Sequence, residues 1–174
     1  MIKTKIIAID KVHLTNLTIF TGLLFIAINA PFFHFQPITG PIVNATLFVA
    51  VLLLGATEGI MIGLLPSLVA LSVGTLPPPL APMIPFIMVS NAILVVVFSY
   101  LQNKNLTFAV VTASITKYLF LLATSYFMVK LISQENMAIK ATSIMMSYPQ
   151  LLTALAGGII AYFAIRAKNA IIIR

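Results

Sequence analysis

The sequence predicts an all-α integral membrane protein, a compact bundle of about six transmembrane helices with both termini on the cytoplasmic side. Three observations lead to this fold class. Apolar residues make up 61% of the chain and charged residues only 7%, whereas about a quarter of the residues of a soluble domain are charged. The mean hydropathy is +1.13. Basic residues flank both the first and the last apolar run. At 174 residues, we expect a single transmembrane domain over residues 1–174.

Six apolar runs give the expected spans. A helix needs about 20 apolar residues to cross a bilayer, and somewhat fewer where neighbours or thinning help. The spans are expected at about residues 14–33, 41–54, 59–74, 83–101, 107–132 and 148–165. The second and third are short. If they formed one long tilted helix, the count would fall to five and the termini would lie on opposite sides.

Polar or proline-rich segments separate these runs. Residues 34–40 form a polar turn, and Pro41 suits the first turn of the helix that follows. Residues 55–58 reverse the chain. Residues 75–82 hold four prolines, which remove donors and block a preceding helical turn, so we expect a stiff loop that can cap a pocket. Residues 133–147 are the longest predicted loop.

The basic residues predict the orientation, because they gather on cytoplasmic flanks. With the N-terminus inside, seven of the ten lie inside, two outside and Lys117 within the fifth span. The seven are Lys3, Lys5, Lys11, Lys104, Arg166, Lys168 and Arg174, and the two are Lys130 and Lys140. This asymmetry favours six spans with both termini inside.

The composition argues against catalysis. The chain has no cysteine and only three acidic residues, which disfavours thiol chemistry, thiolate metal sites and paired carboxylates. His13 and His34 fall on opposite sides of the predicted membrane, so they cannot share a metal. No Walker-type loop, Gly-x-Ser-x-Gly or His-Glu-x-x-His motif occurs. We therefore expect no enzyme, no cofactor and no metal.

Polar residues within the spans are candidates for a binding site. A lysine near the membrane centre costs about 2.5–3.5 kcal/mol on insertion scales. Lys117 is therefore either structural, snorkelling or bonding helix carbonyls, or it pairs with a carboxylate or phosphate of a bound solute. Uncharged polar side chains are biased to the external half, where they form interhelical bonds or line a pocket. They are Asn29, His34, Gln36, Asn44, Asn91 and Gln150.

Two sets of small residues predict close helix packing. In lipid, association of helices depends largely on close backbone approach. Gly55, Gly59 and Gly63 are spaced four apart, and Gly157-Gly158 lies between Ala154 and Ala161. Either these faces pack within the bundle, or one of them receives a partner subunit.

Several segments carry a resemblance to a known family. They are Gly40-Pro41-Ile42-Val43-Asn44-Ala45, the Gly55/Gly59/Gly63 series with Pro66, and Leu80-Ala81-Pro82-Met83-Ile84-Pro85-Phe86-Ile87-Met88 with Asn91. Together with the six-helix layout over about residues 14–166, they resemble a bacterial subgroup of the substrate-binding S components of energy-coupling factor (ECF) transporters.

The resemblance implies partners and a cargo. An S component captures a vitamin, metal or other micronutrient externally and docks on a transmembrane T subunit driven by two ABC-type ATPases. The family's first helix often carries an Ala-x-x-x-Ala docking stripe, where this chain has only Thr18 and Gly22 at that spacing. Nickel and cobalt members bind metal through an N-terminal His segment, whereas this chain begins Met1-Ile2-Lys3, so transition-metal cargo is not expected.

The leading hypothesis is a substrate-binding membrane subunit of an ECF-type uptake transporter with a small, vitamin-like organic cargo. Its polar contacts are expected to be Asn44, Asn91, Lys117, Tyr118 and Gln150, with Lys117 favouring an anionic group. Stacking surface is expected from Phe33, Phe86 and Tyr148. The alternatives are a structural or assembly subunit that binds no solute, and a small stand-alone carrier or channel.

Overall fold

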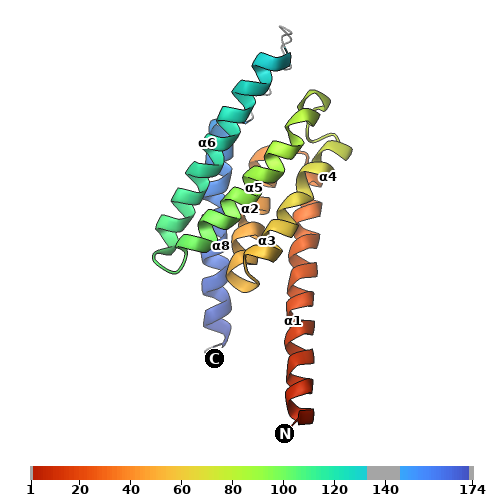
Figure 1. Ribbon diagram of the computed structural model, residues 1–174, viewed down its shortest axis with the longest axis vertical. Helices are drawn as coiled ribbons and strands as arrows, with labels where there is room; N and C mark the ends of the chain where they lie inside the picture. Colours follow the sequence, from red (N-terminus) through yellow and green to blue (C-terminus); the bar gives the residue numbers. More distant parts are fainter. Residues whose placement is uncertain (1, 133–145, 173–174) are drawn as a thin grey trace.

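The computed structural model describes residues 2–132 and 146–172, which form a bundle of helices (Figure 1) with no strand in these ranges. The α-helices and two short 3-10 helices, in chain order, are α1 (Ile2–Asn29), η1 (Ala30–Phe33), α2 (Gln36–Leu53), α3 (Ala56–Leu64), α4 (Pro66–Ser72), η2 (Pro78–Met83), α5 (Ile84–Leu101), α6 (Leu106–Ile132) and α8 (Tyr148–Ile172).

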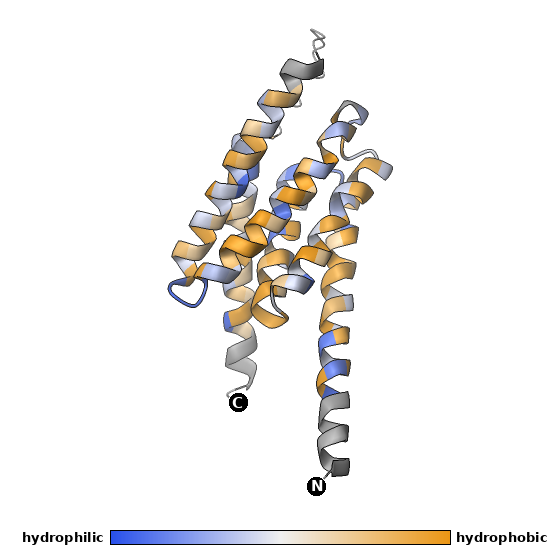
Figure 2. Cartoon of the chain, viewed as in Figure 1, coloured by the Kyte–Doolittle hydropathy of each residue, from blue (hydrophilic) through white to orange (hydrophobic). Residues whose placement is uncertain are grey.

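The predicted all-α membrane bundle is confirmed. Five stretches are long and apolar enough to cross a bilayer: Lys11–Phe33, Gln36–Leu53, Leu80–Leu101, Leu106–Met128 and Tyr148–Ala167. A sixth apolar stretch, Ala56–Ser72, is shorter. Figure 2 shows apolar residues along the middle of the bundle, and polar ones in α1 just above its grey end and in the turn between α5 and α6.

The expected third span is not one continuous helix. It divides into α3 and α4, which meet at Leu65 directly before Pro66. A proline has no backbone N–H and its ring clashes with the preceding turn, so it breaks a helix interior but suits a first helical position. The span expected at about residues 59–74 therefore consists of two helices that meet at this proline.

The single long helix considered for residues 41–74 is also wrong. Helix α2 ends at Leu53 and α3 begins at Ala56. Gly55 lies between them at φ +119°, a conformation that glycine adopts at little cost and other residues do not. The reversal is therefore tighter than the predicted one over residues 55–58.

Two other boundaries lie earlier than predicted. Helix α1 begins at Ile2, so it extends far beyond the apolar run through the basic flank. Helix α2 begins at Gln36 with a proline in its first turn, and Pro41 lies inside it. The predicted polar turn over residues 34–40 therefore shrinks to His34 and Phe35, with His34 left-handed at φ 52°.

The proline-rich segment is partly helical, contrary to the prediction for residues 75–82. Residues Pro78–Met83 form η2, because a short 3-10 turn tolerates prolines that a longer α-helix does not. The segment is tied down at Thr75, whose hydroxyl donates a 2.7 Å hydrogen bond to the Pro31 carbonyl. Most of the predicted loop over residues 133–147 lies outside the described residues.

Helix α2 lies at the centre of the bundle, in contact with α1, α3, α5 and α8. The rings of Phe48 on α2 and Phe98 on α5 meet edge to face with centroids 4.7 Å apart.

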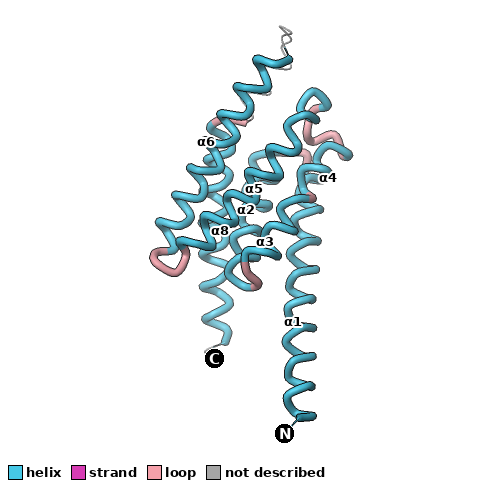
Figure 3. The backbone as a smooth tube through the Cα atoms, viewed as in Figure 1, coloured by secondary structure: helices cyan, strands magenta, loops and turns pink. Residues whose placement is uncertain are grey.

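Both termini lie at the same end of the molecule (Figure 1). The α5–α6 turn lies toward that end too, whereas the α4–α5 connection lies at the opposite one (Figure 3).

Both predicted glycine faces pack inside the bundle. A Cβ atom at Gly157 on α8 would lie 2.7 Å from Cβ of Asn44 and 2.8 Å from the backbone nitrogen of Ala45, both on α2. A Cβ at Gly63 on α3 would lie 3.1 Å from Cβ of Asn91 on α5. These glycines allow the close backbone approach that holds helices together in lipid.

Replacing Gly157 by alanine is expected to destabilise the bundle. The added methyl group meets backbone on α2, and overpacking of this kind costs about 1–3 kcal/mol. Gly22→Ala is the matched control, because nothing lies within 4 Å of a Cβ at that position of α1. Equilibrium unfolding in mixed micelles is the measurement. Equal stability of Gly157→Ala, Gly22→Ala and wild type would contradict the packing described here.

Candidate binding cavity

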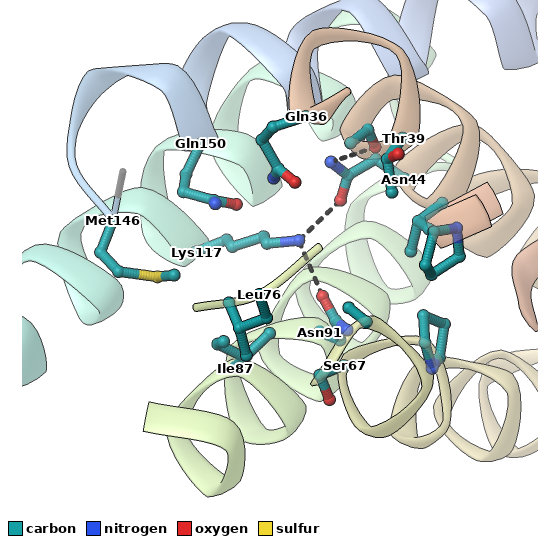
Figure 4. Close-up of a pocket in the computed structure, with 15 residues that line it drawn as sticks. Gln36, Thr39, Asn44, Ser67, Leu76, Ile87, Asn91, Lys117, Met146 and Gln150 are labelled. Atoms are coloured by element: carbon teal, nitrogen blue, oxygen red, sulfur yellow. Dashed lines mark hydrogen bonds between the residues drawn. The ribbon is translucent and has the colours of Figure 1, made fainter. Parts of the chain in front are cut away.

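A cavity of about 70 Å³ lies between the helices, in the half of the bundle away from the termini. It is bounded by η1, the first turns of α2 and α8, α4, and parts of α5 and α6 (Figure 4). The lining residues are Pro31, Gln36, Thr39, Gly40, Val43, Asn44, Pro66, Ser67, Ala70, Leu76, Ile87, Asn91, Lys117, Met146 and Gln150.

The ammonium of Lys117 is the polar centre of this cavity. Its Nζ donates one hydrogen bond of 2.6 Å to Oδ1 of Asn44 and another of 2.7 Å to Oδ1 of Asn91. Lys117 comes from α6, Asn44 from α2 and Asn91 from α5. One side chain therefore joins three helices that are far apart in the sequence (Figure 4).

The two asparagines are themselves held in place by backbone carbonyls. Nδ2 of Asn44 donates to the Gly40 carbonyl at 2.9 Å, and Nδ2 of Asn91 donates to the Gly63 carbonyl at 2.8 Å. With each amide nitrogen bound to a helix, each amide oxygen faces the lysine. The site is therefore built to accept hydrogen bonds from a cation.

Burial makes the charge of Lys117 expensive. The side chain is 3% exposed, and its two partners are 2% and 3% exposed. Within the described ranges, Lys117 bonds only to the two neutral amides and forms no ion pair. Glu58, the acid nearest the membrane in the sequence, lies instead in the first turn of α3. The two amides supply hydrogen bonds to Nζ but carry no opposite charge.

The remaining wall is partly polar and partly apolar. The side chains of Gln36 and Gln150 extend toward the space around the lysine (Figure 4). Gln36 is half-buried, whereas Gln150 is 8% exposed. The apolar side chains of Val43, Leu76, Ile87 and Met146 complete the lining. A small molecule with one polar end and a short apolar body would match this wall.

Four of the five predicted contact residues come together here: Asn44, Asn91, Lys117 and Gln150. Tyr118 does not line the cavity, because successive residues of a helix point about 100° apart and Lys117 already faces inward. None of the aromatic residues expected to stack on a solute lines the cavity. Phe33 and Tyr148 are 60% and 61% exposed. Phe86 packs against the apolar cluster that includes Leu76 and Met146, without lining the cavity itself.

Other lining residues were not predicted from the sequence, among them Thr39, Ser67 and Met146. The hydroxyl of Ser67 is buried and has no hydrogen-bond partner among the described residues. The available signal was Pro66, because a proline inside an apolar run interrupts the helix there, and Ser67 is the polar residue next to it. The expected cap over residues 75–82 contributes one lining side chain, Leu76.

The environment of Lys117 also differs from the structural roles considered for it. It neither snorkels to the membrane surface nor bonds helix carbonyls, because its partners are two side-chain amides.

Over the described part of the chain, no three His, Asp or Glu side chains are grouped so that they could hold a metal ion.

Fold and cavity together define a class of protein: a multi-pass helical membrane protein with a central polar cavity around one buried cation. The family described as "ECF transporter, substrate-specific component" matches residues 12–170. The chain belongs to this family. It is therefore a substrate-binding membrane subunit of an ECF transporter rather than an enzyme, and a multi-pass protein of a prokaryotic cell membrane. No curated protein and no solved structure matches the chain.

The Lys117–Asn91 hydrogen bond is expected to couple the two side chains energetically. Hydrogen bonds to charged groups contribute about 1.5–3 kcal/mol, so Asn91→Ala should destabilise wild type by about that amount. In the Lys117→Met background no ammonium loses a hydrogen-bond partner, so Asn91→Ala should cost less unfolding free energy. A double-mutant cycle measured by unfolding in mixed micelles isolates the coupling energy. Additive losses would show that the pair is not coupled.

Proposed function

We propose that this protein captures a small, vitamin-like organic solute in the cavity around Lys117. The observation that carries the proposal is the buried ammonium, held by two anchored amides at the wall of a cavity and without a neutralising partner in the described residues. A purely structural polar cluster has no need of adjoining empty space. The family, which consists of substrate-specific components, supports the same reading over an assembly subunit or a stand-alone channel.

We further propose that the cavity faces the outside of the cell. The cavity lies in the half of the bundle away from both termini, and the basic residues of the chain concentrate near the termini and in the α5–α6 turn. Since basic flanks favour the cytoplasm, the termini are cytoplasmic and the α1–α2 and α4–α5 connections are external. A solute then enters from outside the cell.

The proposed partners are a transmembrane T subunit and a pair of ABC-type ATPases. In the family, the first helix often docks through small residues. On α1, Leu17, Thr18, Thr21, Gly22 and Phe25 line a surface groove. Gly22 has no neighbouring atom within 4 Å of a Cβ position, so this stretch of α1 is open to a partner helix. Thr18 and Gly22 then take the place of the family's alanine pair.

Native mass spectrometry of gently purified protein tests solute capture directly. Wild type from cells grown in rich medium is expected to carry a stoichiometric small-molecule adduct that survives detergent exchange. Lys117→Gln should lose most of it, whereas Lys104→Gln, in the exposed α5–α6 turn, should retain it. A bare wild-type protein would instead favour the structural subunit.

Single-cysteine labelling tests the orientation, since the natural chain has no cysteine. Phe35→Cys lies at an exposed position between η1 and α2, and Lys104→Cys at an exposed position between α5 and α6. A membrane-impermeant maleimide is expected to label Phe35→Cys in intact cells. It should label Lys104→Cys only after permeabilisation. The reverse pattern would place the cavity on the cytoplasmic side.

A further inference from the structure

We infer that the solute is a compact organic monoanion of the carboxylate class, bound through the ammonium of Lys117. The inference rests on the proposed function and names its substrate class. It draws on three features of the cavity: a buried lysine whose two partners are uncharged, a third N–H donor of its ammonium with no partner among the described residues, and a small volume with a largely apolar wall.

The charge argues for an anion. Lys117 bonds to two neutral amides and to no carboxylate in residues 2–132 and 146–172. Uncharged amides reduce the desolvation cost of an ammonium but leave its net charge in place, and an opposite charge at hydrogen-bond distance is the strongest remaining stabilisation. A cationic solute would instead be repelled, and a neutral one would leave the charge uncompensated.

The hydrogen-bond geometry leaves room for one such group. An ammonium has three N–H donors, and Asn44 and Asn91 take two of them. The two amides cannot easily turn away, because their nitrogens are bound to the Gly40 and Gly63 carbonyls. A carboxylate oxygen can accept the third ammonium N–H. The half-buried amide of Gln36, which lines the same space, can donate to the other carboxylate oxygen.

The volume argues for a compact molecule. A cavity needs about 10–15 Å³ to hold one water by the same measure, so about 70 Å³ accommodates roughly five to seven water-sized groups. A short monocarboxylate fits this space without movement of the walls. A multi-ring vitamin would require α4, Leu76 or Met146 to move outward.

The wall favours a carboxylate over a phosphate. Phosphate carries up to two charges and three strongly accepting oxygens, whereas the cavity offers one cation and few donors. Val43, Leu76, Ile87 and Met146 line much of the rest, and they suit a short hydrocarbon body. Carboxylate at one end and an apolar body at the other therefore match the two halves of the wall.

The test pairs each carboxylate with its uncharged primary amide of almost the same shape. The probes are propionate, butyrate and valerate against propionamide, butyramide and valeramide, with inorganic phosphate as a further anion. Binding is measured as ligand-induced thermal stabilisation and by titration calorimetry, on the full chain in nanodiscs at pH 7. At least one carboxylate is expected to bind at least about tenfold more tightly than its amide. Lys117→Gln should abolish this preference, and Lys104→Gln should keep it.

A second variant covers the case in which Lys117→Gln does not fold. Asn44→Asp places a carboxylate 2.6 Å from Nζ, and the hydrogen bond it loses is to a carbonyl, Gly40, four residues earlier on the same helix. This built-in anion should raise the melting temperature of the ligand-free protein and remove carboxylate binding. Asn44→Gln, which supplies no charge, should not raise it.

The outcomes separate this inference from the proposed function. Equal binding of carboxylates and amides, tighter binding of phosphate, or an Asn44→Asp variant that still binds carboxylate would overturn the monocarboxylate class. Failure of all probes would overturn it too, yet a neutral or larger adduct in native mass spectrometry would leave solute capture intact. If no adduct and no probe binds, the proposed function itself fails.

Discussion

A buried ammonium must be solvated by the protein itself, and in this bundle the solvation of Lys117 constrains three helices at once. The two asparagine oxygens that accept its hydrogen bonds come from α2 and α5. For both to lie within hydrogen-bond distance of one atom, α2, α5 and α6 must keep a particular rotation and spacing. Apolar contacts such as Phe48 against Phe98 hold the helices together. The polar contacts select one rotation among the several that apolar packing allows.

Two glycines on neighbouring helices help to hold the asparagine partners of Lys117 in place. Gly157 allows α8 to lie directly against the backbone beside Asn44, and Gly63 allows α3 to approach Asn91 closely enough for its carbonyl to bind that amide. Each asparagine is thus held between the lysine on one side and a neighbouring backbone on another. Small residues in membrane helices are often described only as packing devices. In this chain they also orient the ligands of a buried charge.

The break at Pro66 gives the cavity part of its wall. The separation into α3 and α4 turns Pro66, Ser67 and Ala70 toward it. The segment after α4 then brings Leu76 to the same wall and is fixed to η1 through Thr75 and the Pro31 carbonyl. The end of the bundle proposed to be external therefore includes three short, proline-containing helices, η1, α4 and η2.

The sequence by itself determined the all-α membrane class, most of the helices and four of the residues around the cavity. The length of each apolar run and the scarcity of charged residues are properties of the local sequence, so they predict membrane-spanning helices without knowledge of the tertiary structure. A lone lysine in an apolar run needs hydrogen-bond partners from other helices, so the sequence alone indicates that polar residues elsewhere lie near it. The rotation of each helix about its axis was decided only by the tertiary structure. Helices that are apolar on every side can face lipid equally well in several rotations. That rotation excluded Tyr118 and the aromatic residues from the cavity, admitted Ser67 and Met146, and chose two amides rather than helix carbonyls as the partners of Lys117.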